Sequence, residues 1–406
     1  MLGRSGISYG PRGYSSLPSG FFSGRPRSLL SRAFARNGVL RHVDWLLILV
    51  VCGLSALGVL LVWSATEPGL VAQGADPHTY LKKQLLNVII GFVLMIAVTF
   101  IDSRRLRSLT PVVYGLTLLA LLAVMTPVGS DVNGAKAWIS LPGGFQIEPS
   151  EFAKLALVMA TATILSLHGG ARPGAKALLI ALVCAAPLLG LVVIEPALGV
   201  AMVLVVTLAV MIVLSGMRLR IIATLVAITA AGIAFAGGLH LLKSYQLTRF
   251  TSFLHPASNQ SSTGYNAAQA KIAVGSGGMF GQGLFHGQSV AGNFVPAQQT
   301  DFIFTVAGEE LGFVGAIVIV FLLGVVIVRA LRIAARADDQ FGMLVASGIA
   351  IWFAFQSFVN IGMTIGIMPI TGLPLPFLSY GGSAVFADMI AIGMLQSIHR
   401  RHSVFE

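Results

Sequence analysis

Long apolar runs separated by short polar segments dominate the chain from residue 45 onward. A run of about 17 residues or more can cross a hydrocarbon layer of ~30 Å as a helix. Ten segments qualify and so predict an all-α integral membrane protein with about ten transmembrane helices. They cover approximately residues 45–64, 85–101, 111–128, 152–167, 177–194, 198–214, 221–242, 302–328, 342–367 and 383–398.

Basic residues in the polar segments predict the orientation of these helices. With an even number of spans and the N-terminus inside, 19 of the 26 Lys and Arg residues fall on the inner side. Positive charge is enriched on the cytoplasmic side of membrane proteins. We therefore expect both termini to be cytoplasmic and two long loops, 129–150 and 243–300, to be extracytoplasmic, so that chemistry faces outward.

Residues 1–43 differ from the rest of the chain. They contain no acid, are rich in Arg, Ser, Gly and Pro, and have no apolar periodicity, which predicts a disordered basic cytoplasmic tail. An organelle transit peptide has a similar composition. The membrane domain then covers 44–400, and 401–406 form a short cytoplasmic tail.

Composition supports the membrane class and excludes others. Apolar residues make up 56% of the chain and charged residues 10%, with a mean hydropathy of +0.86. The net charge of +11 is concentrated on the inner side, which points to the positive-inside asymmetry rather than to nucleic-acid binding. Both cysteines lie within apolar runs, so no disulfide framework or zinc site is indicated.

Three carboxylates lie in the stretch FVPAQQTDFIFTVAGEELGFVG at 294–315. Asp301 stands where the long outer loop enters a span, either as a helix N-terminal carboxylate stabilised by the helix dipole or as a partly desolvated general base. Glu309 and Glu310 lie two turns deeper. Because acids within a membrane are costly, we expect these two to be functional or paired with a base.

A second candidate is the stretch EPSEFAKL at 148–155, which places Glu151 and Lys154 on one helical face. The two form either a simple ion pair or a site where the ammonium binds phosphate. Other outer residues could contribute charge, a sugar-stacking ring or hydrogen bonds to a substrate. They are Lys136, Trp138, Arg249, Gln269 and Lys271.

The last outer segment, MPITGLPLPFLSYGGSAVF, contains three prolines and a Ser-Tyr-Gly-Gly-Ser turn with Ser379 and Ser383. Such irregular backbone at membrane depth is tolerated only where it is buried or lines a cavity. Asp388 follows in the last span and is expected to face the interior of the bundle. The glycine run at 275–283 does not match a phosphate-binding P-loop, and no catalytic triad or metal-ligand cluster is evident.

Taken together, these stretches resemble the SEDS family of bacterial membrane proteins (shape, elongation, division and sporulation), most of all its RodA branch and less its FtsW branch. The matching segments occur in the family's order over nearly the whole chain. They are GAKAW at 134–138, EPSEFAKL at 148–155, EPALG at 195–199, YQLTRF at 245–250, AQAKIAVGSGGMFGQG at 268–283, FVPAQQTDFIF at 294–304, GEELGFVG at 308–315 and TGLPLPFLSYGGS at 371–383.

The resemblance implies a peptidoglycan glycosyltransferase in the bacterial plasma membrane that polymerises lipid II for cell elongation and shape. It also implies a class B penicillin-binding protein as transpeptidase partner, and a divalent cation such as Mg²⁺ or Mn²⁺ as a candidate cofactor. Asp301 matches the family's essential aspartate. Five further residues match its motif positions: Lys136, Trp138, Glu151, Lys154 and Lys271. This chain departs from the family's pattern at Ala197, Thr364 and Ala384.

On this reading Asp301 removes a proton from a sugar hydroxyl that attacks the anomeric carbon of the growing chain. Lys154, Arg249 and Lys271 are candidates to stabilise the pyrophosphate leaving group. Two other functions fit parts of the pattern. A flippase for the same lipid-linked saccharide would also need charges within the membrane, but most charges here lie at the outer rim. A non-catalytic scaffold would leave that outer cluster unexplained.

Overall fold

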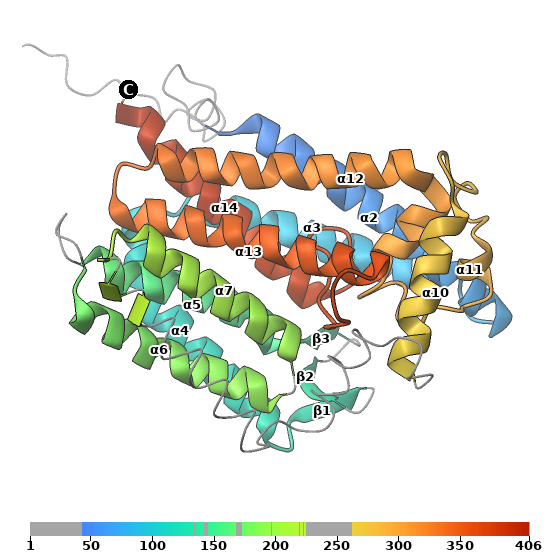
Figure 1. The fold of residues 1–406 in the computed structure, drawn as a ribbon, viewed down its shortest axis with the longest axis horizontal. Helices are drawn as coiled ribbons and strands as arrows, with labels where there is room; N and C mark the ends of the chain where they lie inside the picture. Colours follow the sequence, from blue (N-terminus) through green and yellow to red (C-terminus); the bar gives the residue numbers. More distant parts are fainter. Residues whose placement is uncertain are drawn as a thin grey trace, which may run out of the picture. The chain divides into compact units, whose positions relative to one another are not determined.

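The computed structural model describes residues 43–132, 135–141, 145–167, 173–195, 197–218, 220–221, 223–224 and 262–405. Within these ranges the chain is mainly helical (Figure 1). The long helices are α2 (Trp45–Ala72), α3 (Thr79–Thr99), α4 (Ser103–Met125), α5 (Pro149–Ser166), α6 (Ala175–Ile194), α7 (Leu198–Leu214), α12 (Ile303–Ala335), α13 (Gln340–Ile365) and α14 (Gly382–Phe405). Two shorter helices are α10 (Ser262–Ser276) and α11 (Gln288–Ala291).

Six of the described helices are long and apolar enough to cross a membrane: α2, α3, α4, α6, α12 and α13. The chain is therefore a multi-pass helical membrane protein, as the apolar runs predict. Nine of the ten predicted runs overlap a helix in the described part of the chain. The run at 221–242 lies almost entirely outside that part, as does the predicted tail at 1–43, so ten spans and the orientation of the loops stay predictions.

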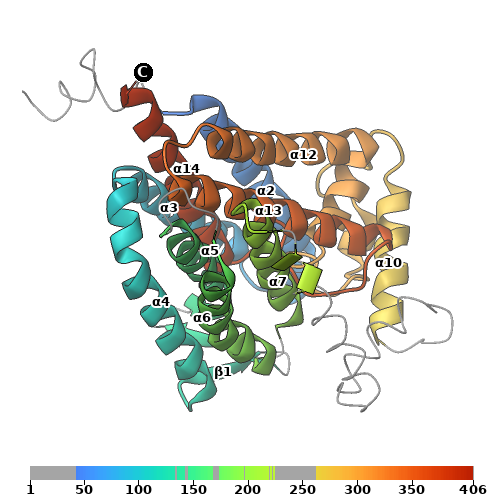
Figure 2. The same cartoon turned by 60° about the vertical axis from the view of Figure 1, so that its left-hand side comes forward.

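Helix α13 occupies the middle of the bundle. It packs against α12 on one side and against α7 and α5 on the other, an arrangement visible in Figure 1. Helix α5 in turn packs against α4, α6 and α7 (Figure 2), while α14 packs along α3. The most buried helices are thus α5, α13 and α14, which carry most of the polar residues of the candidate site.

The segment 129–150, predicted to be a long extracytoplasmic loop, contains a small antiparallel sheet. Its strands are β1 (Gly129–Val132), β2 (Ala135–Leu141) and β3 (Phe145–Ile147), in the order β1-β2-β3. In the register, Ile139 is paired with Gly129 on one side and with Ile147 on the other. Pairing within the sheet satisfies main-chain groups that an extended loop would leave to water.

Helix α12 is interrupted near its beginning. Gly312 has φ 67° and ψ −167°, so the α12 backbone is not helical there. The loop at 277–283 repairs the break, because Gln282 N and Gly283 N donate to the carbonyls of Glu309 and Glu310 at 2.9 and 3.0 Å. In return, Phe313 N and Val314 N donate to the carbonyls of Gly278 and Met279 at 2.9 and 3.1 Å.

The glycine run makes this close pairing possible. A Cβ atom added to Gly281 would lie 2.1 Å from the carbonyl oxygen of Glu310, and one added to Gly312 would lie 2.2 Å from the main-chain nitrogen of Gly281. Both glycines also have positive φ. Any side chain at these two positions would separate the loop from the helix.

Candidate functional site

Asp301 lies just before α12, and the main chain leading to it is held by three consecutive carbonyl groups. The carbonyl of Gln299 accepts from Tyr380 N at 2.8 Å, and that of Thr300 accepts from Ser379 Oγ at 2.7 Å. The Asp301 carbonyl itself accepts from Asn360 Nδ2 at 2.8 Å. Because each donor comes from outside the loop, the position of the Asp301 backbone is fixed by α13 and by the segment Thr371–Tyr380.

We call Thr371–Tyr380 (TGLPLPFLSY) the 371–380 segment. It passes beside the Asp301 carboxyl group, since a Cβ added to Gly372 would lie 3.5 Å from Asp301 Oδ2. Gly372 has a φ of +72°, so this approach depends on glycine. Asp301 is partly buried, and a general base needs this combination of fixed position and access to substrate.

The second group of site residues surrounds Lys154, whose side chain is only 1% exposed. Its ammonium donates to Glu151 Oε2 at 2.7 Å and to Gln356 Oε1 at 2.8 Å. The ammonium also lies 4.7 Å from the centroid of the Trp352 ring, which is a cation–π distance. Lys154 is therefore neutralised within the protein rather than presented to solvent.

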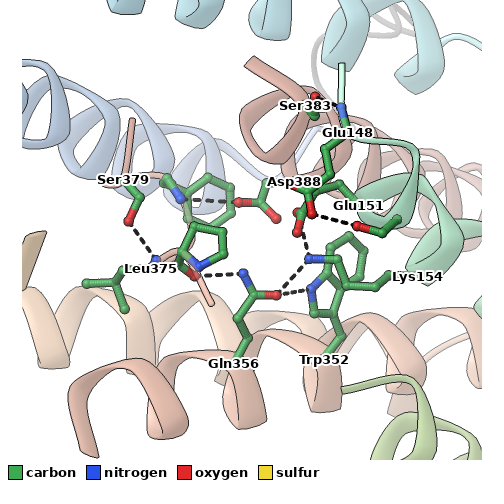
Figure 3. Close-up of polar contacts among 12 residues, drawn as sticks. Glu148, Glu151, Lys154, Trp352, Gln356, Leu375, Ser379, Ser383 and Asp388 are labelled. Atoms are coloured by element: carbon green, nitrogen blue, oxygen red, sulfur yellow. Dashed lines mark hydrogen bonds and ion pairs between the residues drawn. The ribbon is translucent and has the colours of Figure 1, made fainter. Parts of the chain in front are cut away.

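Gln356 connects Lys154 to the 371–380 segment. Its Oε1 also accepts from Trp352 Nε1 at 2.7 Å, and its Nε2 donates to the Pro374 carbonyl at 2.8 Å. Figure 3 shows Gln356 between the Lys154 group and this segment, with Asp388 close by. Asp388 Oδ2 accepts from Phe377 N at 3.3 Å. A continuous polar network thus runs from Lys154 to the segment that holds Asp301.

The two predicted serines join the 371–380 segment and α14 to the site. Besides its bond to Thr300, Ser379 Oγ accepts from Leu375 N at 2.7 Å, which closes a turn within the segment. Ser383 Oγ accepts from Glu148 N at 2.8 Å. Both serines bind backbone groups, so their observed role is to hold the segments that carry Glu148 and Asp301.

Glu148 is an acid that the sequence analysis did not select. Burial and the neighbouring charge of Glu151 raise its pKa to about 7, and the more distant charge of Asp301 acts in the same direction. Ser150 Oγ donates to Glu148 Oε1 at 2.7 Å. The charges of Glu151 and Asp301 therefore both act on Glu148, which lies just before α5.

Glu309 and Glu310 are buried, and each accepts a hydrogen bond from the segment between α10 and α12. Glu309 Oε1 accepts from Ser289 N at 2.7 Å. Glu310 Oε1 accepts from the Ser64 hydroxyl and from Phe285 N, the latter at 3.2 Å. The sequence predicts that these two acids are either functional or paired with a base on another span. Their hydrogen-bond partners in the described part of the chain are main-chain amides and a hydroxyl, so these acids link the loop to α2 and α12.

Backbone strain is concentrated in the same region. Four non-glycine residues in the described part of the chain have positive φ: Phe285, Asn293, Ala297 and Phe377. Three belong to the loop before Asp301 and one to the 371–380 segment. Such residues cost on the order of 1–3 kcal/mol each and cluster at functional sites.

The remaining predicted residues are more dispersed. Lys271, on α10, is exposed, and its Nζ would lie 2.5 Å from a Cβ added to Gly366 at the end of α13. Gln269 is partly buried on α10, and Trp138 is partly buried on β2. Lys136 is placed by its backbone in β2, opposite Asp131, while its side chain and Arg249 lie outside the described residues.

Sequence reasoning missed the polar face of α13. Trp352, Gln356 and Asn360 recur every four residues in α13, and this spacing places them on one face. The polar residues at that spacing could have revealed the site. Asp388 was noticed as an acid within the membrane but was not assigned to the site.

No group of three or more His, Cys, Asp or Glu side chains that could hold a metal ion occurs among the described residues. Mg²⁺ at phosphate sites is often bound by only one or two carboxylates together with substrate phosphates. Substrate phosphates could therefore supply ligand atoms for the predicted divalent cation alongside the described side chains.

Comparison with known proteins identifies relatives over the same range. Residues 44–404 match the family model of the FtsW, RodA and SpoVE cell cycle proteins. The chain is 37% identical over 364 residues to stage V sporulation protein E of Bacillus subtilis, covering 88% of this chain and 97% of the relative. It is 35% identical to the peptidoglycan glycosyltransferase MrdB of Escherichia coli, covering 88% and 94%, and 36% identical to a probable peptidoglycan glycosyltransferase FtsW of Trichlorobacter lovleyi, covering 88% and 93%.

Solved structures give the same result. The chain superposes on the rod shape determining protein RodA of Thermus thermophilus with a TM-score of 0.64 and 30% identity, covering 89% of this chain and 97% of that one. A chain of a peptidoglycan synthase complex, described for its coordination of polymerization and crosslinking, gives a TM-score of 0.73 and 30% identity, covering 89% and 98%.

Proposed function

Because the chain belongs to the family of FtsW, RodA and SpoVE cell cycle proteins, we propose that it is a peptidoglycan glycosyltransferase. Three relatives, named FtsW, MrdB and stage V sporulation protein E, are 36%, 35% and 37% identical to this chain. These values do not separate elongation from division, so the assignment to elongation and cell shape stays a prediction. The proposed substrate is lipid II, a saccharide attached to a membrane lipid through pyrophosphate.

The observation that supports this proposal most is the position of Asp301. Its backbone is held through three successive carbonyls, and the residue is only partly buried just before the membrane helix α12. A lipid-linked substrate keeps its lipid in the bilayer and its sugars in water. A base at the end of a membrane span therefore lies at the depth where such sugars meet the protein.

In the proposed reaction Asp301 accepts the proton of the acceptor sugar's 4-hydroxyl group. The hydroxyl oxygen forms a bond to the anomeric carbon of the growing chain, and the bond from that carbon to the pyrophosphate oxygen breaks. The lipid pyrophosphate leaves with the electron pair, so this single displacement inverts the anomeric carbon. A divalent cation, if bound, would neutralise charge on the pyrophosphate.

The charged residues divide between two roles in this proposal. Lys271 is exposed and is a candidate to meet the leaving pyrophosphate, as is Arg249. Lys154 is bound to Glu151 and Gln356, so in the state described here it acts through the network that supports the 371–380 segment. Trp138 and Lys136 on β2 are candidates for contacts with the saccharide.

We further propose an outward-facing active site in the bacterial plasma membrane and a class B penicillin-binding protein as partner. The basic residues on the predicted inner side support the orientation. The similar structure in a peptidoglycan synthase complex supports the partner. Such a partner would cross-link the glycan strands that this chain polymerises.

The decisive test is Asp301→Asn, which keeps the size of the side chain and removes the base. We expect the rate of glycan-strand formation from labelled lipid II by the purified protein, with its partner, to fall by about 10²–10⁴-fold. Asp76→Asn is the matched control, because Asp76 is an exposed loop acid paired with Lys82. Unchanged polymerisation by the Asp301 variant would contradict the proposal, and lipid II translocation in liposomes that survives the substitution would favour a flippase.

A further inference from the structure

The turn between α6 and α7 carries a buried carboxyl group that the proposed reaction does not use. Glu195 ends α6 and is 3% exposed. Neither of its carboxylate oxygens has a hydrogen-bond partner among the described residues. Buried polar groups are nearly always paired, so an unpaired carboxyl group suggests a ligand or ion that binds there.

This turn lies against the candidate site. A Cβ added to Gly199, four residues after Glu195, would lie 2.7 Å from the Thr371 carbonyl oxygen and 2.6 Å from Leu373 Cγ. These two residues flank Gly372, which approaches the Asp301 carboxyl group. This turn therefore packs against the 371–380 segment, and that segment lies beside Asp301.

Other unpaired polar atoms occur on the elements that meet at Thr371–Leu373. Asn360 uses its Nδ2 to bind the carbonyls of Asp301 and Leu373, but its Oδ1 has no partner in the described part of the chain. Thr371 Oγ1 is likewise buried and without a described partner. Carboxylate and amide oxygens only accept hydrogen bonds, and a hydroxyl can also accept. The region therefore has acceptors in excess of donors.

Charge limits the kind of ligand that can bind. Burial and the neighbouring charge of Glu148 raise the pKa of Glu195 to about 8, so the group is an ionised acceptor only above that pH and keeps one acceptor oxygen when protonated. Lys154, a buried cation of the site, is already bound to Glu151 and Gln356. A pyrophosphate group is rich in acceptors and lacks donors, so it cannot pair with these acceptors, and it is repelled once Glu195 is ionised. Sugar hydroxyls and amide N–H groups supply the missing donors without adding negative charge.

We infer that Glu195, together with Asn360 and Thr371, forms an acceptor subsite that binds the hydroxyl and amide donors of the saccharide part of the substrate. This inference rests on the proposed function and refines it, because it places the sugars beside the turn at 195–199 and the pyrophosphate elsewhere. Glu195 has a binding role here, and the proton transfer stays with Asp301.

The test compares two ligands that share the lipid pyrophosphate but differ in the saccharide. Binding of lipid II and of undecaprenyl pyrophosphate is measured on the full-length protein in an Asp301→Asn background, which prevents turnover. We expect Glu195→Gln to weaken lipid II binding by about 10–100-fold at about pH 9, where Glu195 is ionised, as for the loss of a hydrogen bond to a charged group. Binding of undecaprenyl pyrophosphate should change by less than about twofold.

Three further variants make the result specific. Glu195→Asp keeps the charge and should lose less affinity than Glu195→Gln. Adding Ala197→Asp to Glu195→Gln returns a carboxyl group to the same turn and should restore part of the lipid II affinity. Glu67→Gln is the control, since Glu67 is an acid near the end of α2 that the inference does not involve.

Equal loss of both ligands in a folded Glu195→Gln protein would overturn the inference, as would no loss of either. A loss seen only when Mg²⁺ or Mn²⁺ is present would overturn it in favour of a cation site. The proposed function is tested separately. If the wild-type protein fails to polymerise lipid II yet binds it through Glu195, the glycosyltransferase proposal fails and the subsite stands.

Discussion

Lys154 shows how a charged residue is accommodated inside this membrane protein. An isolated ammonium group is costly to bury, but here a carboxylate, an amide oxygen and an indole ring surround it. Two of these partners are also fixed by another contact, since Gln356 binds both Trp352 and the Pro374 carbonyl. The network therefore holds the 371–380 segment in position as well as the Lys154 side chain.

The Glu151–Lys154 pair should show strong coupling in a double-mutant cycle. Lys154→Met and Glu151→Gln each leave a buried group without its partner, and we expect each to lower stability by about 3–5 kcal/mol. The double variant should lose less than the sum of the two. Thermal and denaturant unfolding of the detergent-solubilised protein measures this difference. Additive losses would show that the two side chains act independently.

The acid at Glu195 predicts how stability depends on pH. Its pKa is raised from 4.5 to about 8 in the folded protein, so the folded state keeps a proton that the unfolded state loses in this range. Stability should therefore be greatest at the acidic end and fall as pH rises through about 8. Glu195→Gln removes the titrating group and should flatten the decline between about pH 6 and 9, measured as the midpoint of thermal unfolding.

Asp76→Asn provides the opposite case for comparison. Hydrogen bonds from Lys82 and the His78 backbone lower the pKa of Asp76 to about 2. Its contribution is therefore present at neutral pH and is lost only in acid. The Asp76 variant should keep the wild-type decline between about pH 6 and 9, and an equally flattened profile would show that the effect at Glu195 is not specific.

At the scale of elements, the interruption of α12 explains the glycine run that resembles no phosphate-binding loop. The loop at 277–283 supplies donors for two carbonyls that the break at Gly312 leaves unpaired. Unpaired main-chain groups are not tolerated within a bilayer unless another part of the protein satisfies them. The short first part of α12, which carries Glu309 and Glu310, is therefore completed by main-chain hydrogen bonds from the loop at 277–283.

Substitution of these glycines should separate the loop from the helix. Gly281→Ala and Gly312→Ala each place a Cβ within 2.2 Å of main-chain atoms and require positive φ. We expect each to lower the thermal midpoint strongly, with losses of about 3 kcal/mol or more from lost hydrogen bonds and strain. Gly275→Ala is the control, because it lies in α10 with no atom within 4 Å of an added Cβ. Tolerance of all three substitutions would contradict the account.

The elements differ in how well sequence alone predicts them. Apolar runs located the long helices because hydropathy is averaged over a whole span. The sheet at 129–147 was missed, although Asn-Gly at 133–134 is a common hairpin signal. Asp301 and the Glu151–Lys154 pair were selected as acids or bases in unusual places. Gln356 and Asn360 are uncharged and became apparent only when tertiary packing placed them beside these groups.

At the scale of the whole molecule, Asp44 joins three helices at the end of the bundle opposite the candidate site. Its Oδ1 accepts from Leu47 N at 3.1 Å and caps α2. Its Oδ2 binds Arg329 of α12 at 2.6 Å, and its main chain exchanges two hydrogen bonds with Gln396 of α14. One acid therefore fixes the beginning of the membrane domain to two helices near the end of the chain.

Asp44→Ala should destabilise the protein more than a loss of helix capping alone. We expect about 2–4 kcal/mol, since the substitution removes the cap and leaves Arg329 without its carboxylate. Asp102→Ala is the matched control, because Asp102 caps α4 through Arg104 N at 3.2 Å but is exposed. It should cost about 1 kcal/mol. Equal shifts in the thermal midpoint would show that the contacts to α12 and α14 add nothing.

The repaired break in α12 also restricts how this part of the chain can change in length. Each main-chain bond between 277–283 and 309–314 depends on a fixed register between the two stretches. Inserting or deleting even one residue in either stretch would misalign the donors and acceptors and leave some of them unpaired. Natural variants of this chain should therefore tolerate length changes outside these two stretches and not within them.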